Sequence, residues 1–92
     1  PMVVAFDVRV SGRVQGVGYR YYARSCAATA GVTGYVRNVP DGTVEAIIVG
    51  PAEACEHMLT ALRKGPLGGR VDAVSAQPLR PPPRYEDFRV TY

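Results

Sequence analysis

The chain has no tryptophan, one histidine, one lysine and only two cysteines among its 92 residues. Cys26 and Cys55 are far apart, and the absence of a Cys-x-x-Cys motif or a Cys/His cluster excludes a disulfide framework and the usual zinc sites. Both cysteines fall in predicted helices, where we expect buried or half-buried thiols, although a bridge between the two helices stays open. The single histidine, His57, has Glu53 and Glu56 as neighbours and is expected on an exposed helix surface.

Long apolar runs are also missing, since none approaches the roughly 20 residues that a membrane-spanning helix requires. The first six residues lack the charged segment and long apolar stretch of a secretory signal. We therefore expect a cytoplasmic protein without a membrane partner.

Hydrophobic residues make up 47% of the chain and charged residues 21%, which is an ordinary composition for one globular domain over residues 1–92. The net charge is +3, and Lys64 is the only base that is not arginine or histidine. Compositional bias is the simpler explanation of this arginine-rich positive charge, and attraction for an anionic ligand is the functional explanation. Because the arginines are scattered along the chain, no basic stripe indicates a nucleic-acid partner.

Alternation of apolar and polar side chains predicts most of the strands. The expected strands are residues 5–11, 32–38, 43–49, 70–76 (the weaker pattern) and 88–92. Residues 12–18 are expected as a loop, because three glycines so close together weaken any helix or strand. Pro40-Asp41-Gly42 is a turn signal that predicts a hairpin, and the proline-rich residues 78–84 predict a stiff connection.

Two segments have the spacing of helices. In residues 19–30 an aromatic and three alanines share one face, and Gly31 is a good C-terminal cap. Residues 52–64 have an apolar stripe, an early Glu53 and a basic end, and the helix dipole favours that charge distribution. The order is β-α-β-β-α-β with an extra short strand. It predicts an α+β, ferredoxin-like sandwich whose mixed sheet carries both helices on one face. We expect the protein to be a monomer.

Topology brings two distant residues to one edge of this sheet. A strand–helix–strand crossover makes the first two strands parallel, so the glycine loop and Asn38 both follow carboxyl ends of strands at the same edge. Arg20 begins the helix that leaves the loop. Glycine-rich backbone and a helix N-terminus can hold an anion, and a bound anion would offset the unfavourable position of Arg20 at the positive end of the helix. A loop that only turns the chain beside a solvated arginine is the alternative.

Other ligand-binding motifs fit poorly. The loop lacks the Gly-Lys-Ser/Thr ending of a Walker A motif and the third glycine of the dinucleotide fingerprint. RNA-recognition domains share the element order, but residues 43–49 offer no aromatic side chain on which a base could stack. Metal-carrying domains of similar topology need paired cysteines after the first strand, and this loop has none.

Two motifs carry a family resemblance. The string Gly12-Arg-Val-Gln-Gly-Val-Gly-Tyr-Arg20 closely resembles the signature of acylphosphatases, and so does Gly34-Tyr-Val-Arg-Asn38 followed by Asp41-Gly42. The similarity extends from about Val8 to Tyr92. Tyr19 stands where that family also has Phe, and Tyr35 stands where it often has Trp.

The resemblance implies an enzyme that hydrolyses small-molecule acyl phosphates to a carboxylate and inorganic phosphate, without a metal or other cofactor. Arg20 would then hold the phosphate together with backbone amides of the loop, and the side chain of Asn38 would orient the attacking water. The loop amides implied are those of Gln15, Gly16, Val17, Gly18 and Tyr19. Arg37 is expected to point to the opposite face as a surface charge.

A closer alternative is an acylphosphatase-like module of a larger protein, as in hydrogenase-maturation carbamoyltransferases, where carbamoyl phosphate would be the ligand. A free-standing enzyme fits the sequence better.

Overall fold

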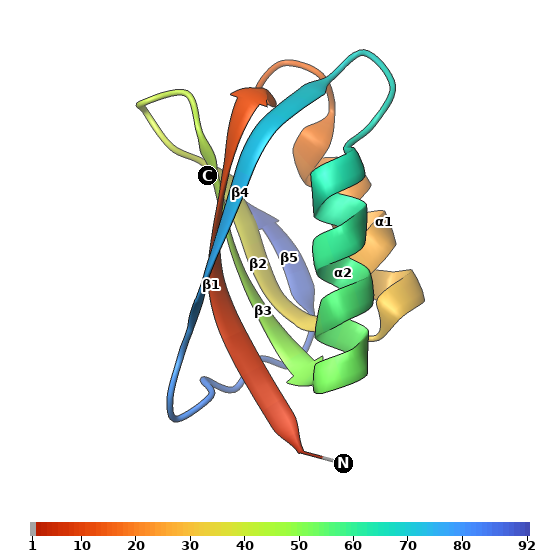
Figure 1. Ribbon diagram of the computed structural model, residues 1–92, viewed down its shortest axis with the longest axis vertical. Helices are drawn as coiled ribbons and strands as arrows, with labels where there is room; N and C mark the ends of the chain where they lie inside the picture. The colour runs from red at the N-terminus through yellow and green to blue at the C-terminus, as the bar shows by residue number, and fades with distance from the viewer. Residues whose placement is uncertain (1) are drawn as a thin grey trace.

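The computed structural model describes residues 2–92 and confirms the predicted α+β fold, in the chain order β1-α1-β2-β3-α2-β4-β5. The strands are β1 (Val3–Arg13), β2 (Thr33–Asn38), β3 (Val44–Pro51), β4 (Arg70–Pro78) and β5 (Phe88–Thr91). The helices are α1 (Tyr19–Ala30) and α2 (Ala52–Lys64). Both helices cover the same face of the sheet, as Figure 1 shows.

The five strands form one mixed sheet in the order β4-β1-β3-β2-β5. Strand β3 pairs antiparallel with both β1 and β2, so these two run in the same direction, as the crossover predicts. The extra short strand is β5, which lies parallel to β2 at the edge of the sheet. The carboxyl ends of β1, β2 and β5 consequently lie at one end of the molecule, shown at the top of Figure 1.

The first strand is longer than its alternation predicts, because it continues through Gly12 and Arg13 into the expected loop. The register against β4 shifts between Ser11 and Gly12, where Gly12 has a φ of +125°. A side chain there would place its Cβ 2.2 Å from the carbonyl oxygen of Arg70. Glycine therefore permits a close strand contact at this position instead of ending the strand.

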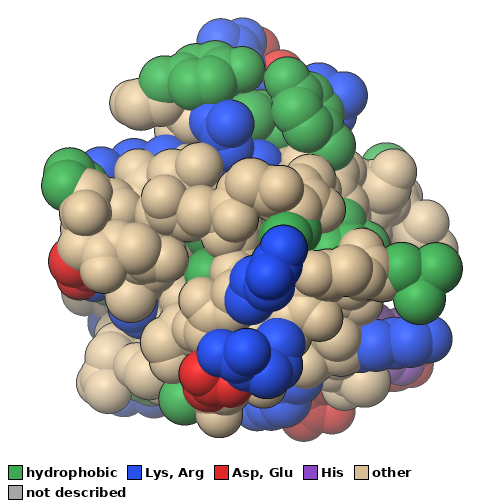
Figure 2. Space-filling view, turned by 90° about the horizontal axis from the view of Figure 1, so that it is seen from above, with side chains coloured by type: hydrophobic (Ala, Val, Ile, Leu, Met, Phe, Trp, Pro, Cys, Tyr) green, Lys and Arg blue, Asp and Glu red, His purple; other side chains and the backbone are tan. Residues whose placement is uncertain are grey.

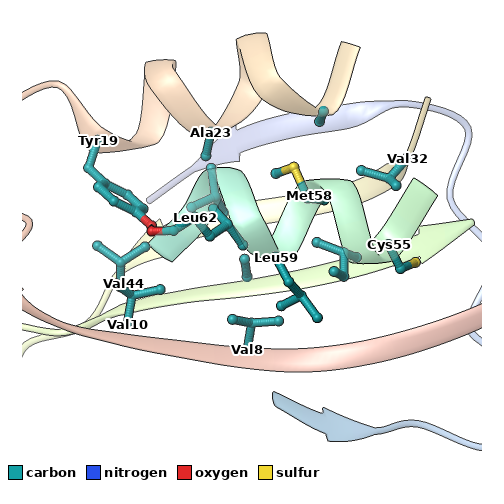
Figure 3. Packing of buried hydrophobic residues seen from close by; sticks show 14 of the residues in the cluster. Val8, Val10, Tyr19, Ala23, Val32, Val44, Cys55, Met58, Leu59 and Leu62 are labelled. Carbon is teal, nitrogen blue, oxygen red and sulfur yellow. The ribbon is translucent and has the colours of Figure 1, made fainter. Parts of the chain in front are cut away.

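The core lies between the helices and the sheet, as the close-up in Figure 3 shows. Tyr19, Ala23 and Ala27 of α1 are buried, and Ala30 packs against them, which confirms the predicted face. The apolar stripe of α2 is also buried as predicted, and it meets β-branched side chains of the sheet. The residues involved are Cys55, Met58, Leu59 and Leu62 of α2, and Val8, Val10, Val44 and Ile48 of β1 and β3.

The face of the sheet that the helices leave open is partly covered by the chain after β4. A small buried cluster of Ala5, Ile47 and Val49 lies there, with Tyr35 and Leu79 packed against it. Both cysteines are free thiols, Cys55 buried and Cys26 half-buried, so the inter-helix bridge that the sequence left open is not formed. His57 is exposed, as expected.

Neither helix of residues 2–92 combines the length and apolar character that crossing a membrane would take.

Candidate active site

The loop between β1 and α1 is held in place by two adjacent residues. Val14 is buried in the core, and the side-chain amide of Gln15 donates hydrogen bonds of 2.8 Å to the carbonyl oxygens of Val39 and Thr43. These two carbonyls belong to the turn between β2 and β3. The loop is therefore fixed to the hairpin that follows Asn38, although 24 positions separate Gln15 from Val39.

Two glycines give the rest of the loop its shape. Gly16 and Gly18 have φ values of +76° and +77°, in the left-handed region that other residues rarely adopt. Gly18 is the N-cap of α1 and offers no side chain to the first amides of the helix. Within residues 2–92, no backbone N–H from Gln15 to Tyr19 donates a hydrogen bond. These unpaired donors lie in a glycine loop at a helix N-terminus, and backbone of this kind can bind anions.

The side chain of Tyr19 points away from this loop into the core. It is 1% exposed, and its hydroxyl donates a hydrogen bond of 2.6 Å to the carbonyl oxygen of Leu62 in α2. Burial raises the pKa of this phenol, with a smaller contribution from nearby Tyr22. Only the backbone amide of Tyr19 is thus available to a ligand, in agreement with the backbone role that the sequence resemblance implies.

Arg20 lies in the first turn of α1, where no acidic residue offsets its charge. One guanidinium nitrogen donates a hydrogen bond of 3.2 Å to the carbonyl oxygen of Thr91, and the guanidinium carbon lies 4.6 Å from the centre of the Tyr92 ring. Within the described part of the chain, no carboxylate forms an ion pair with Arg20. Its charge is held in place by the end of β5 while several of its N–H groups stay available.

Asn38 ends β2 and pairs with Val44 of β3. It follows the alternation of β2 and shares the helix-covered side of the sheet with buried Val36. Its side-chain oxygen Oδ1 is buried without a hydrogen-bond partner. Leaving a buried acceptor unpaired costs about 1–3 kcal/mol, so a turn of this amide toward a donor such as a water molecule would be favourable.

Two tethers bring the loop, Arg20 and Asn38 together. Gln15 holds the loop against Val39, the residue that follows Asn38. Arg20 is bonded to Thr91, which pairs in β5 with Arg37, the residue that precedes Asn38. The three sequence-predicted elements of the site therefore lie at the same end of the molecule, the end seen in Figure 2, where Lys and Arg side chains are spread among uncharged atoms.

Arg37 points to the opposite face of the sheet, as predicted. Its Nε donates a hydrogen bond of 2.7 Å to Glu45, which also accepts one of 2.9 Å from the hydroxyl of Tyr35. The hydrogen bond from Arg37 is the main reason that the pKa of Glu45 is lowered. This arginine therefore serves an ion pair on the open face and does not belong to the candidate site.

Sequence reasoning missed the side-chain role of Gln15 and the contacts of Arg20 with Thr91 and Tyr92. Gln15 is the one uncharged polar side chain in the predicted loop of residues 12–18, and this is the available signal for its role. The contacts of Arg20 span 71 residues, and no local pattern indicates them. Among the described residues, no group of three His, Cys, Asp or Glu side chains is arranged to hold a metal ion.

Comparison with known proteins identifies the family to which the chain is similar over most of its length. The profile of the family described as Acylphosphatase matches residues 6–90. An acylphosphatase of Rhizobium etli is 46% identical over 87 residues, which cover 95% of this chain and 93% of that protein. The crystal structure of acylphosphatase from Bacillus subtilis superposes with a TM-score of 0.94 at 32% identity, covering 99% of this chain and 100% of the other.

The same architecture also occurs within much longer chains. In the crystal structure of T. kodakarensis HypF, the matching region is 28% identical with a TM-score of 0.85 and covers 97% of this chain but 12% of HypF.

Proposed function

The chain belongs to the acylphosphatase family and hydrolyses acyl phosphates to a carboxylate and inorganic phosphate, and we propose that Arg20, the loop amides and Asn38 perform this reaction. In the proposed site the phosphate is held by Arg20 and by the backbone N–H groups of Gln15 to Tyr19. Asn38 orients the attacking water. The observation that carries the proposal is the set of unpaired amides from Gln15 to Tyr19 beside an arginine that has no carboxylate partner in the described chain.

The proposed phosphate site combines two kinds of donor. The backbone amides of the glycine loop would bond the phosphate oxygens, and the N-terminus of α1 adds its partial positive charge. Arg20 supplies a planar fork that can bond two phosphate oxygens at once. Its bond to the Thr91 carbonyl uses one of five N–H groups and fixes the side chain in advance, so less freedom is lost when phosphate binds.

Asn38 would act by position. Once the amide turns toward the bound phosphate, its Oδ1, which has no partner within the described residues, can accept a hydrogen from the attacking water and aim the oxygen lone pair at phosphorus. A carboxamide cannot deprotonate water at neutral pH, so the proton passes to an oxygen of the transferred phosphate. The new P–O bond forms as the bond between phosphorus and the acyl oxygen breaks, and that electron pair leaves on the carboxylate.

So sparse a site suffices because the leaving group is a carboxylate. A stable carboxylate needs little help from a general acid, and the main tasks are to place the water and to stabilise the charged phosphoryl oxygens. The proposed arrangement supplies both of these from one loop, one helix end and one strand end.

The test separates the two roles by comparing turnover with phosphate binding. We expect Asn38→Ala to lower kcat for benzoyl phosphate at least about 100-fold, while the inhibition constant of inorganic phosphate changes less than about threefold. We expect Arg20→Lys to weaken both strongly, because an ammonium cannot reproduce the fork. Arg37→Gln is the matched control on the opposite face. Equal loss of turnover and phosphate binding in Asn38→Ala would contradict the division of roles, and near-normal activity of Arg20→Lys would contradict the bidentate contact.

We also propose that the enzyme works as a cytoplasmic monomer without a metal ion or nucleic-acid partner. The proposed mechanism assigns every step to a side chain, an amide or the substrate. Turnover that persists undiminished after dialysis against a chelator is expected, and loss of activity that a divalent cation restores would contradict this part of the proposal. Sedimentation at micromolar concentration checks the oligomeric state.

A further inference from the structure

A row of four side chains begins at Arg20 and continues along the surface of α1. The Arg20 guanidinium lies 4.6 Å from the centre of the Tyr92 ring, the hydroxyls of Tyr92 and Tyr21 are 3.4 Å apart, and the Arg24 guanidinium lies 5.1 Å from the centre of the Tyr21 ring. We call these four residues the arginine–tyrosine row. It begins at the proposed phosphate site and ends at a second cation.

The two rings and Arg24 are exposed, whereas Arg20 is half-buried. Tyr21 is 51% and Tyr92 is 87% exposed, so neither ring is used to fill the core. Arg20 and Arg24 are four positions apart on one helix, where like charges repel each other. Within residues 2–92, no carboxylate forms an ion pair with either of them. Two neighbouring cations without an acidic partner form a surface that favours a ligand with two negative groups.

The aromatic rings hold the second cation in place. A guanidinium over the face of a tyrosine ring is attracted by the ring's electrons, and the contact restricts an otherwise flexible side chain. Arg24 is therefore presented about one helical turn, roughly 6 Å along the axis, from Arg20. The two rings between them offer apolar surface along which a short hydrocarbon chain can lie.

We propose that the arginine–tyrosine row binds the acyl part of the substrate, and that Arg24 selects acyl phosphates whose acyl group ends in a second carboxylate. The inference rests on the proposed function, because it takes the phosphate to be held at Arg20. From there the acyl chain passes over Tyr92 and Tyr21, and its terminal carboxylate meets the fork of Arg24. The substrate class is thus the monophosphate of a dicarboxylic acid.

The experiment compares two substrates of equal length in one enzyme. Adipoyl monophosphate ends in a carboxylate, and its monoamide ends in a neutral carboxamide of the same shape. We expect the native enzyme to have a kcat/KM for the carboxylate about threefold to fivefold higher than for the amide, as suits one solvent-exposed ion pair. In Arg24→Gln the ratio should fall to about one. Arg63→Gln, which removes one exposed charge from α2, should keep the native ratio. The preference should also shrink as salt is raised.

The ratio of the two substrates decides the inference, and turnover of the amide decides the proposed function. A native ratio near one, or a ratio unchanged in Arg24→Gln, would overturn the role of Arg24 while leaving the phosphate site standing. Failure of the native enzyme to hydrolyse either substrate would overturn both proposals. A ratio lost to the same extent in Arg63→Gln would mean that net charge, and not Arg24, sets the preference.

Discussion

The side-chain amide of Gln15 donates a hydrogen bond of 2.8 Å to the carbonyl oxygen of Val39, the residue directly after Asn38. A second bond of the same length reaches Thr43 across the turn. The loop that would hold the phosphate and the strand end that would hold the water are consequently linked by one side chain. The relative position of this loop and this strand end therefore depends on the Gln15 side chain as well as on the sheet.

Removal of this link should lower both activity and stability. We expect Gln15→Ala to lower kcat/KM for benzoyl phosphate about tenfold, because a misplacement of about 1 Å between reacting groups is costly. Two lost hydrogen bonds should lower the free energy of unfolding by about 1–2 kcal/mol, measured by urea denaturation. Gln77→Ala on β4, which removes an exposed amide, is the control. Native kinetics in Gln15→Ala would show that the loop keeps its position without this tether.

The left-handed glycines allow a matched pair of substitutions. Gly18 at the start of α1 and Gly31 at its end have φ values of +77° and +81°, and an added Cβ would meet nothing within 4 Å at either position. Alanine at each should therefore cost a similar backbone strain of about 1–2 kcal/mol in the free energy of unfolding.

Only the first of the two should affect catalysis. In Gly18→Ala the strained loop turns its amides away from the phosphate, so the inhibition constant of inorganic phosphate should rise about tenfold or more. Gly31 lies 13 positions further along the chain, so in Gly31→Ala the inhibition constant of inorganic phosphate should equal that of the native enzyme. Equal phosphate binding in the two variants would argue that the loop amides do not contact the ligand.

Much of this architecture can be predicted from local pattern. The apolar faces of α1 and α2 repeat at helical spacing, and the hairpin of β2 and β3 has its own turn signal, so their positions depend on residues close in sequence. The shared edge of Gly18 and Asn38 follows from the parallel direction that the strand–helix–strand crossover gives to β1 and β2.

The rest depends on contacts that no short window contains. The parallel pairing of β5 with β2 joins residues more than 50 positions apart, and it alone brings Thr91 and Tyr92 to Arg20. The bulge at Gly12 has the same origin, since the close carbonyl belongs to Arg70 on another strand. The glycine pattern predicts a loop there, whereas the structure has a close approach of two strands.

The buried tyrosine that begins α1 should make the fold sensitive to alkali. Burial raises the pKa of Tyr19 well above its usual value near 10, and burial also raises the pKa of Tyr22 and of Tyr35 to about 12. A phenol with a raised pKa keeps its proton longer in the folded state than in the unfolded chain. Its contribution to stability is complete below pH 10 and is lost as the pH rises toward the folded-state value. We therefore expect the free energy of unfolding to be flat from pH 7 to 9 and to fall between pH 10 and 12.

Tyr19→Phe shows how much of this slope belongs to one hydroxyl. The variant loses the 2.6 Å hydrogen bond to the Leu62 carbonyl, so it should be about 1–2 kcal/mol less stable at pH 7. Having no proton to release, it should also lose stability less steeply above pH 10. Urea denaturation at a series of pH values measures the native protein and the variant. An alkaline slope that is the same with and without the Tyr19 hydroxyl would mean that this phenol is not what couples the fold to alkali.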